Sequence, residues 1–170
     1  DGISALTGGS KRPAAVIPLG LQGIGSVDPV KTDVEGAKKL LADANQANGF
    51  SFEVTFANYA PYGVPLSTVW EKLKSDLAKI KVNITLKPVE YDAWLQAYRT
   101  GTLPMTSSIW APDFLDVTNY LDVFARPGGL VTKRMGIVID QLGTLYDQII
   151  ATTDTAKRED LAKQSATIMR

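Results

Sequence analysis

Apolar side chains recur every three or four positions in several stretches of the chain, which is the period of a helix with one buried face. In the first stretch, Thr32 and Glu35 have the spacing of a capping box, so a helix is expected to begin at residue 33. Its apolar stripe includes Val34, Leu40 and Leu41. The helices expected along the chain are 33–48, 67–79, 91–100, 117–124, 139–152 and 155–170.

Three other stretches have the properties of strands. Residues 50–59 and 81–87 alternate apolar and polar side chains, and Pro88 is expected to end the second. Residues 105–110 form a short apolar run of the kind found in buried strands. The order strand–helix–strand–helix–strand, with short connections, predicts an α/β fold with a mainly parallel βαβαβ sheet flanked by helices on both faces.

Parallel strands end at the same edge of a sheet, and ligands of open α/β sheets bind at that edge. Asn58 and Tyr59 end the first expected strand, and Glu90 follows the second. Residues 110–116, which contain Trp110, Asp113 and Asp116, follow the third. We therefore expect these side chains to converge on one edge.

A structural interpretation of the same stretch is also open. Trp110 and Phe114 could be core residues, since both are large and aromatic. Asp113 or Asp116 could be the N-cap of the next helix, since aspartate is a common N-cap residue. For Asp116, capping the helix expected at 117–124 is favoured over ligand contact. The residue types alone do not separate this interpretation from a binding role.

Composition excludes several classes of function. The 170 residues carry 18 basic and 18 acidic side chains, so no surplus of positive charge indicates a nucleic-acid partner. The chain has no cysteine and no histidine, which excludes disulfides, cysteine nucleophiles and Ser–His–Asp catalysis. No run of about 18 apolar residues is present, so no membrane-spanning segment is predicted. No cofactor is expected.

The length fits one domain or one lobe of a larger protein. Residues 1–6 have the pattern of a helix end stopped by Gly8 and Gly9, and the last helix shows no stop signal before Arg170. We therefore expect residues 1–170 to be a single lobe cut from a longer protein. Within it, the segment 10–32 is rich in proline and glycine and is expected to be irregular.

Several segments, in order, resemble a known family. Residues 34–44, VEGAKKLLADA, resemble a helix of the pattern P-E-K-A-K-x-L-L-x-E-A. Residues 110–121, WAPDFLDVTNYL, resemble the signature W-x-x-D-Y-P-D-P-x-N-F-L. Residues 153–158, TDTAKR, resemble T-D-x-x-K-R. The family is that of the extracytoplasmic solute-binding proteins of ABC importers, in the class that takes peptides, nickel complexes and related solutes.

The resemblance implies the second, C-terminal lobe of a two-lobe periplasmic-binding-protein-like fold. It implies capture of a peptide or related small solute between the lobes and delivery to an ABC permease at the membrane, with no enzymatic activity. It also implies a periplasmic or extracellular location, with or without a lipid anchor. Nickel-chelate, opine and oligosaccharide binding are alternatives within the same fold, and the first lobe is the missing partner of the cleft.

The resemblance also implies roles for single residues. The signature aspartate falls on Asp113, which would pair with the ammonium group of a peptide. Trp110 would form a wall against a side chain or a cationic group. Asp116, Asn119 and Tyr59 are further ligand-binding candidates, and no metal ligand is predicted. The chain departs from the pattern at Leu115 and Val117, which stand where prolines are usual.

Three rival hypotheses rest on the residues alone. Asp113 and Asp116 are a candidate carboxylate pair for a hydrolase, although no further acid–base partner is evident. Asp113, Asp116 and Asp122 are a candidate calcium set, although their spacing matches no EF-hand loop. An interaction domain that contacts the permease through exposed helices is compatible with the binding role.

Overall fold

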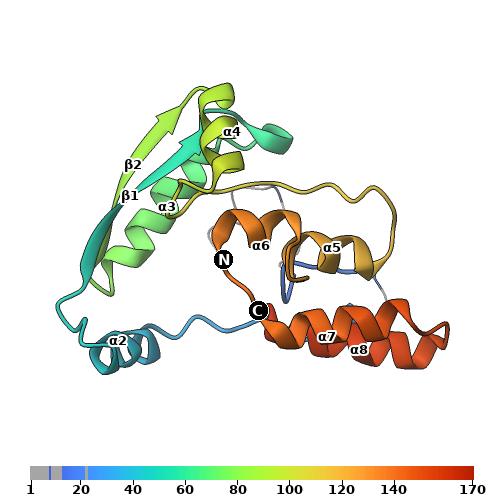
Figure 1. Cartoon of the computed structure of the whole chain (residues 1–170). Helices are drawn as coiled ribbons and strands as arrows, with labels where there is room; N and C mark the ends of the chain where they lie inside the picture. The colour runs from blue at the N-terminus through green and yellow to red at the C-terminus, as the bar shows by residue number, and fades with distance from the viewer. Residues whose placement is uncertain (1–7, 9–12, 22) are drawn as a thin grey trace. The chain divides into compact units, whose positions relative to one another are not determined.

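The computed structural model of the chain describes residue 8 and residues 13–21 and 23–170 (Figure 1). These residues belong to two compact units. We call residues 31–109 the sheet unit, and the described residues of 13–30 together with 110–170 the helical unit. The helix end expected at residues 1–6 lies outside the described residues. That residues 1–170 form one lobe stays a prediction.

The sheet unit contains a parallel pair of strands with a helix on each face. Strand β1 (Phe50–Ala57) pairs with β2 (Val82–Val89) in a register that matches Phe50 to Val82 and Ala57 to Val89. Val54 and Phe56 point to the face covered by α3 (Leu66–Ala78), where they pack with Trp70. Ala57 points to the opposite face and packs with Trp94 and Tyr98 of α4 (Tyr91–Thr100). The expected parallel sheet between helices is confirmed.

The third expected strand is absent, because residues 105–110 have no strand assignment. Side chains make the contacts that a backbone ladder would have made. The Thr106 hydroxyl donates a hydrogen bond to the Thr55 carbonyl of β1 at 2.7 Å and accepts one from Trp94 Nε1 at 2.8 Å. Trp70 Nε1 donates to the Ser107 hydroxyl at 3.1 Å. The segment therefore lies against β1 and both helices without pairing, and the sheet of the described residues has two strands.

Pro88 was expected to end the second strand, but it lies inside β2. The Val89 carbonyl accepts a hydrogen bond from the Asn58 amide at 2.8 Å, so the polar backbone groups of Val89 face β1. Neighbouring residues of a strand point their backbone groups to opposite sides. The missing N–H of Pro88 therefore faces away from β1 and leaves no gap in the ladder.

Helix α2 (Val34–Asp43) differs from its prediction in cap, length and burial. The cap is Asp33, whose side chain accepts a hydrogen bond from the Gly36 amide at 2.8 Å, and not Thr32. Aspartate and threonine are both good caps, so the pattern leaves an ambiguity of one residue. The helix ends five residues before Asn48, and its apolar stripe is not buried: Leu40 is 71% exposed.

The helical unit packs four helices and a short 3₁₀ turn around one core. These elements are η1 (Ile24–Ser26), α5 (Val117–Phe124), α6 (Leu130–Met135), α7 (Asp140–Ile150) and α8 (Thr155–Ile168). Ile17, Ile24, Leu121 and Ile149 are fully buried in it. In Figure 1, α7 and α8 run side by side. Helix α6 was not predicted, because six residues are too short to show a helical period.

The described part of the 10–32 segment is irregular apart from η1, as expected. It is nevertheless well packed, with Ile17 and Ile24 in the core. Gly23 has a φ of 74°, and a Cβ at this position would lie 2.2 Å from the Glu159 carbonyl oxygen of α8. Only glycine allows this close approach of the segment to the helix. In the sheet unit, a second 3₁₀ turn, η2 (Pro61–Gly63), follows β1.

Candidate functional site

Trp110 is held by a buried hydrogen-bond partner. Its indole Nε1 donates to Oδ1 of Asn119 at 2.9 Å, and Asn119 lies on α5 with only 5% of its surface exposed. The Phe124 ring meets the indole edge-to-face, with ring centroids 6.3 Å apart. A half-buried indole with a hydrogen bond at one end and a ring against it has a defined orientation. Asn119 therefore positions Trp110.

Asp116 is the N-cap of α5, as the structural interpretation predicted. Its Oδ1 accepts hydrogen bonds from the amide of Thr118 at 2.9 Å and from the Thr118 hydroxyl at 2.7 Å. Its Oδ2 accepts one at 2.8 Å from Arg158 Nη2, which comes from α8. Arg158 also donates to the carbonyl of Ile149 at 2.6 Å. Asp116 thus joins the start of α5 to α7 and α8.

The charge of Asp116 follows from these contacts. Burial alone would raise its pKa, but the hydrogen bonds from Thr118 and the Arg158 guanidinium together outweigh burial and lower the pKa below the usual 3.8. The carboxylate is therefore ionised at neutral pH, with both oxygens occupied. A ligand role for Asp116 stays a prediction that these contacts do not favour.

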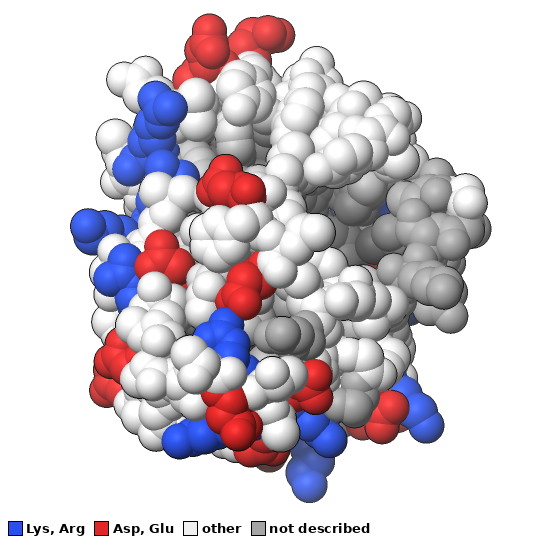
Figure 2. All heavy atoms as spheres, turned by 90° about the vertical axis from the view of Figure 1, so that its right-hand side faces the viewer, with Lys and Arg blue, Asp and Glu red and all other residues white. Residues whose placement is uncertain are grey.

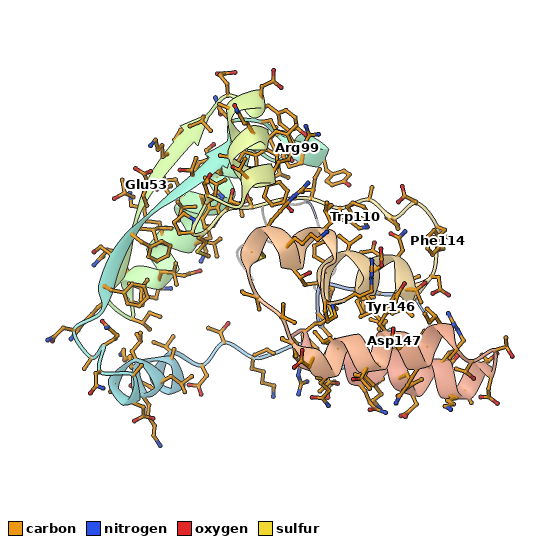
Figure 3. All side chains as sticks on the ribbon, viewed as in Figure 1. Glu53, Arg99, Trp110, Phe114, Tyr146 and Asp147 are labelled. Carbon is orange, nitrogen blue, oxygen red and sulfur yellow. The ribbon has the colours of Figure 1, made fainter. Side chains whose placement is uncertain are left out.

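Asp113 differs from Asp116 although the two lie three residues apart. It is exposed, and no hydrogen bond or ion pair joins its carboxylate to any described residue. The next two side chains are also exposed, Phe114 at 54% and Leu115 at 85% (Figure 3). The expectation that Phe114 belongs to the core is therefore wrong. The turn at 111–115 presents, between apolar side chains, a carboxylate that is unpaired among the described residues.

Tyr59 lies in the sheet unit, whereas the other four candidates lie in the helical unit. Its ring packs edge-to-face against Tyr91, with centroids 5.6 Å apart. Burial raises the pKa of the Tyr59 hydroxyl, and the neighbouring Tyr91 and Tyr62 raise it further. The phenol therefore stays neutral, able to donate or accept a hydrogen bond. The convergence of Tyr59 and Glu90 with Trp110 on one edge stays a prediction.

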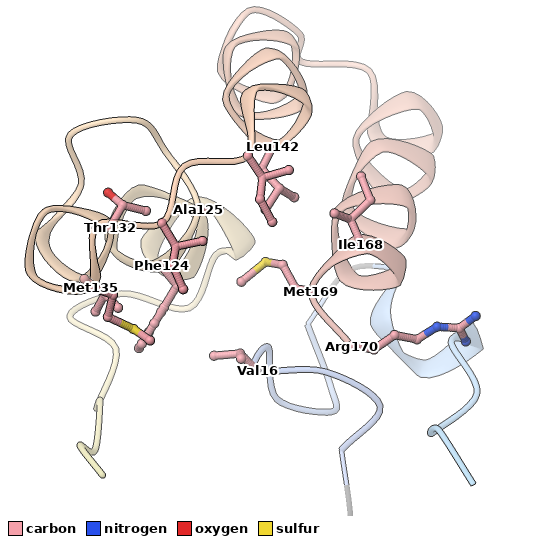
Figure 4. A pocket seen from close by; sticks show the side chains of 12 residues that line it. Val16, Phe124, Ala125, Thr132, Met135, Leu142, Ile168, Met169 and Arg170 are labelled. Atoms are coloured by element: carbon pink, nitrogen blue, oxygen red, sulfur yellow. The ribbon is translucent and has the colours of Figure 1, made fainter. Parts of the chain in front are cut away.

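Among the described residues of the helical unit are two pockets whose lining is mainly apolar. One, of about 500 Å³, lies directly beside the 111–115 turn and is lined by Pro18, Leu19, Leu21, Pro112, Leu115 and Tyr120. We call it the turn pocket. The other, of about 300 Å³, lies among α5, α6, α7 and the end of α8 (Figure 4). Its lining includes Phe124, Met135, Ile168, Met169 and Arg170 and contains no acidic side chain.

The rival sites find little support in the geometry. Within the described residues, no three acidic side chains are grouped so as to hold a metal ion. Asp122 is paired with Arg126 at 2.5 Å, and Asp116 is paired with Arg158. A carboxylate pair for hydrolysis would need Asp116 free to exchange protons, whereas its oxygens are engaged. The observed contacts suit a structural role for Asp116.

Charge on the surface is mixed. On the face shown in Figure 2, acidic and basic side chains are interspersed along the left and lower parts, without a continuous patch of either sign. This agrees with the equal numbers of acidic and basic residues. Across the part of the chain that the structure describes, every helix is too short or too polar to cross a bilayer.

Comparison with known families identifies the chain. Residues 3–130 match the model for the middle part of the bacterial extracellular solute-binding proteins, family 5. No curated protein matches the chain. The match covers most of the sequence, so the chain belongs to this family. Its members are binding proteins of ABC importers and act outside the cytoplasm.

Solved structures agree on the fold. HbpA2 from Haemophilus parasuis superposes with a TM-score of 0.85 at 23% identity, covering 98% of this chain and 34% of that one. DppA from Helicobacter pylori in complex with the peptide STSA superposes with a TM-score of 0.82 at 22% identity, covering 99% of this chain and 33% of DppA. AgaA from A. tumefaciens R10 in complex with agropinic acid superposes with a TM-score of 0.76 at 24% identity, covering 98% of this chain and 35% of AgaA. The chain spans about a third of the length of these proteins.

Sequence reasoning missed two parts of the site. The pairing of Arg158 with Asp116 joins residues 42 apart, and the only signal for it was that both belong to segments that resemble the family. The turn pocket combines residues 18–21 with 112–120, and no period or spacing connects them. The departure at Leu115 was noticed in the sequence, but its exposure beside a pocket was not predictable from it.

Proposed function

We propose that the chain is one lobe of the solute-binding component of an ABC importer, which captures a peptide or a related small solute and delivers it to a membrane permease. Membership of family 5 supports this role. The similarity to DppA in complex with the peptide STSA supports a peptide as the solute. Because the chain spans a third of such proteins, the role belongs to the longer protein of which it would be a part.

The exposed carboxylate of Asp113, three residues after the anchored Trp110 in the sequence, carries the proposal. A solute with an ammonium group needs an acidic partner that is not already neutralised, and Asp113 has no such partner among the described residues. Enclosure by a second lobe would remove water from this pair and strengthen a charge-assisted hydrogen bond. Trp110, kept in place by Asn119, would supply a rigid wall.

The proposed mechanism is closure of two lobes around the solute. In it Asp113 and Trp110 are the principal contacts, whereas Asn119 acts through Trp110. Tyr59, with a neutral phenol, would be a secondary contact on the sheet unit. The protein would work in the periplasm or at the outer cell surface, with or without a lipid anchor.

Binding of an opine is the second candidate, because AgaA in complex with agropinic acid has the same fold. Nickel chelates and oligosaccharides are further alternatives. A peptide is favoured by the free carboxylate, since an ammonium group is common to all unmodified peptides. A carboxylate-dependent hydrolase is disfavoured because both oxygens of Asp116 are engaged.

Calorimetry on the longer two-lobe protein tests the proposal, after native mass spectrometry has identified any co-purified solute. Replacing Asp113 with asparagine is expected to weaken peptide binding roughly 10- to 100-fold, the value of a hydrogen bond to a charged group. N-acetylation of the peptide is expected to have a similar effect. The matched control is Asp147→Asn, which changes an exposed acid of α7 in the same unit. Equal binding by Asp113→Asn and wild type would overturn the role of Asp113.

The 170-residue chain by itself offers a second test. It lacks the surface that a second lobe would contribute, so we expect it to bind the same peptide at best weakly, with a Kd of about 1 mM or more. Micromolar binding by the chain alone would show that one lobe is sufficient and would contradict the closure mechanism.

A further inference from the structure

The side chain of Asn48 is exposed and unrestrained. The residue lies in the turn between α2 and β1, and no hydrogen bond joins its carboxamide to any described residue. By contrast, the carboxamide of Asn119 is buried and accepts a hydrogen bond from Trp110. That of Asn83 donates to the Lys81 carbonyl at 3.4 Å. The side chain of Asn48 can therefore rotate onto the backbone that follows it.

The residue after Asn48 is a glycine that the fold requires. Gly49 has a φ of 74°, and a Cβ at this position would overlap the backbone carbonyl of Lys81. Only glycine satisfies both conditions. Because glycine has no side chain, its amide nitrogen is the least shielded one that a preceding carboxamide can meet. Bulkier residues follow the other asparagines of the chain, which are Asn45, Asn58, Asn83 and Asn119.

The contacts of the turn are weak barriers to a reaction at the Gly49 nitrogen. The Gly49 amide donates a hydrogen bond to the Gln46 carbonyl at 2.7 Å. This bond has to open before the nitrogen can react, and hydrogen bonds of exposed turns open locally at a low cost in free energy. The Lys81 ammonium group donates to the Ala47 carbonyl at 3.3 Å, so a cation adjoins the turn. A nearby positive charge favours the ionised form of an amide nitrogen that has lost its proton.

We propose that Asn48 is a site of spontaneous deamidation, which converts it into aspartate and isoaspartate just before β1. The Gly49 nitrogen attacks Cγ of Asn48, so that a carbon–nitrogen bond forms and the Cγ–Nδ2 bond breaks. Ammonia leaves with the proton that the Gly49 nitrogen has lost, and a cyclic imide remains. Water then opens the imide: addition at Cγ gives aspartate, whereas addition at the backbone carbonyl carbon of Asn48 gives isoaspartate.

Isoaspartate at this position is expected to disturb the start of the sheet. It leads the main chain through Cβ and Cγ and so lengthens it by one atom. Strand β1 begins directly after Gly49, with Phe50 paired to Val82. Because Gly49 lies against the Lys81 backbone, the added atom has to displace either the turn or Phe50. The first pairs of the two strands are therefore expected to loosen, while the buried residues further along β1 stay packed.

Peptide mapping by mass spectrometry tests the site on the purified chain, incubated in mildly alkaline buffer. Asn48 is expected to deamidate at least about tenfold faster than each other asparagine, because glycine alone leaves the attacked nitrogen unshielded. Labelling by an isoaspartate methyltransferase should appear in the incubated wild type. Asn48→Gln should remove most of this label, since glutamine would have to close a larger ring. Asn83→Gln changes an exposed asparagine of β2 that precedes isoleucine, and this matched control should keep the label.

A synthetic peptide of residues 44–54 measures the same reaction without the fold. If the peptide is converted while Asn48 of the folded chain stays intact, the turn protects the residue and the proposal is overturned. Equal rates at Asn48 and Asn83, or an unchanged label in Asn48→Gln, would overturn it as well. Urea denaturation tests the consequence: the incubated wild type should unfold at a lower midpoint than fresh protein, whereas incubated Asn48→Gln should keep its midpoint. Equal midpoints in a deamidated wild type would contradict the expected disturbance of β1.

Discussion

The sheet unit and the helical unit satisfy their tryptophans in different ways. In the sheet unit, Trp70 and Trp94 are core residues whose indole N–H groups donate to the hydroxyls of Ser107 and Thr106. In the helical unit, Trp110 is half-buried and donates to a buried amide, Asn119. The first arrangement attaches the irregular segment 105–110 to a core, whereas the second orients a partly exposed ring. Two of the three tryptophans therefore contribute to a core, whereas the third is held in a fixed orientation with part of its ring exposed.

The largest effect is expected in the core of the sheet unit. Phe56 is buried on β1 and stacks on Trp70, with ring centroids 6.0 Å apart. Phe56→Ala is expected to lower the free energy of unfolding by about 3–5 kcal/mol, measured by urea denaturation. Phe114→Ala, at the exposed turn of the helical unit, should change it by less than about 0.5 kcal/mol. Similar losses for both variants would contradict the assignment of one ring to packing and the other to the surface.

A smaller effect is expected for the pair that positions Trp110. Asn119→Leu leaves the indole N–H without its partner, and Trp110→Phe leaves the buried amide without its donor. Each is expected to cost about 1–3 kcal/mol of unfolding free energy. The double variant should cost less than the sum of the two, because both polar groups are then absent. Strict additivity would show that the hydrogen bond is not energetically coupled.

The Asp116–Arg158 pair is expected to make stability depend on pH. The pKa of Asp116 is lower in the folded chain than its usual 3.8, so its ionised form stabilises the fold. The contribution is fully present above about pH 4 and is lost as the pH falls through the folded value. Asp116→Asn keeps a good cap but removes the charge, and should cost about 1 kcal/mol at pH 7. Urea denaturation between pH 2 and 7 should show the two proteins converging at the acid end; a constant difference would exclude the charge as the cause.

The smallest effect is expected for the ion pair on the strands of the sheet unit. Lys87 Nζ lies 3.1 Å from Glu53 Oε1 across β1 and β2, and both side chains are about half exposed (Figure 3). Glu53→Gln should change the unfolding free energy by no more than about 1 kcal/mol, and salt should abolish the change. A larger effect that persists in high salt would contradict this expectation and group the pair with the less exposed Asp116–Arg158 pair.

Local patterns predicted most of the elements. Alternation placed β1 and β2, and helical spacing placed α3, α4, α5, α7 and α8, with every end within two residues of the observed one. Each of these elements has an apolar face that is buried in a core. The third strand failed because Thr106 bonds to β1 through its side chain and not through its backbone. The apolar stripe of α2 was expected to be buried and is not. The period of the apolar positions identifies a helix, but it does not show whether another element covers its apolar face.

For the candidate site, the sequence determined the residue types and their order. It determined that an aromatic side chain and two carboxylates follow a break at Pro112, and that a helix begins just after Asp116. Only the tertiary structure decided which carboxylate has no partner among the described residues. Arg158, 42 residues further along the chain, neutralises Asp116, and Asn119 orients Trp110. Asp113 and Leu115 are left exposed, and Leu115 lines the turn pocket. The reason is physical: whether a charge is paired depends on which groups the fold brings within about 4 Å of it.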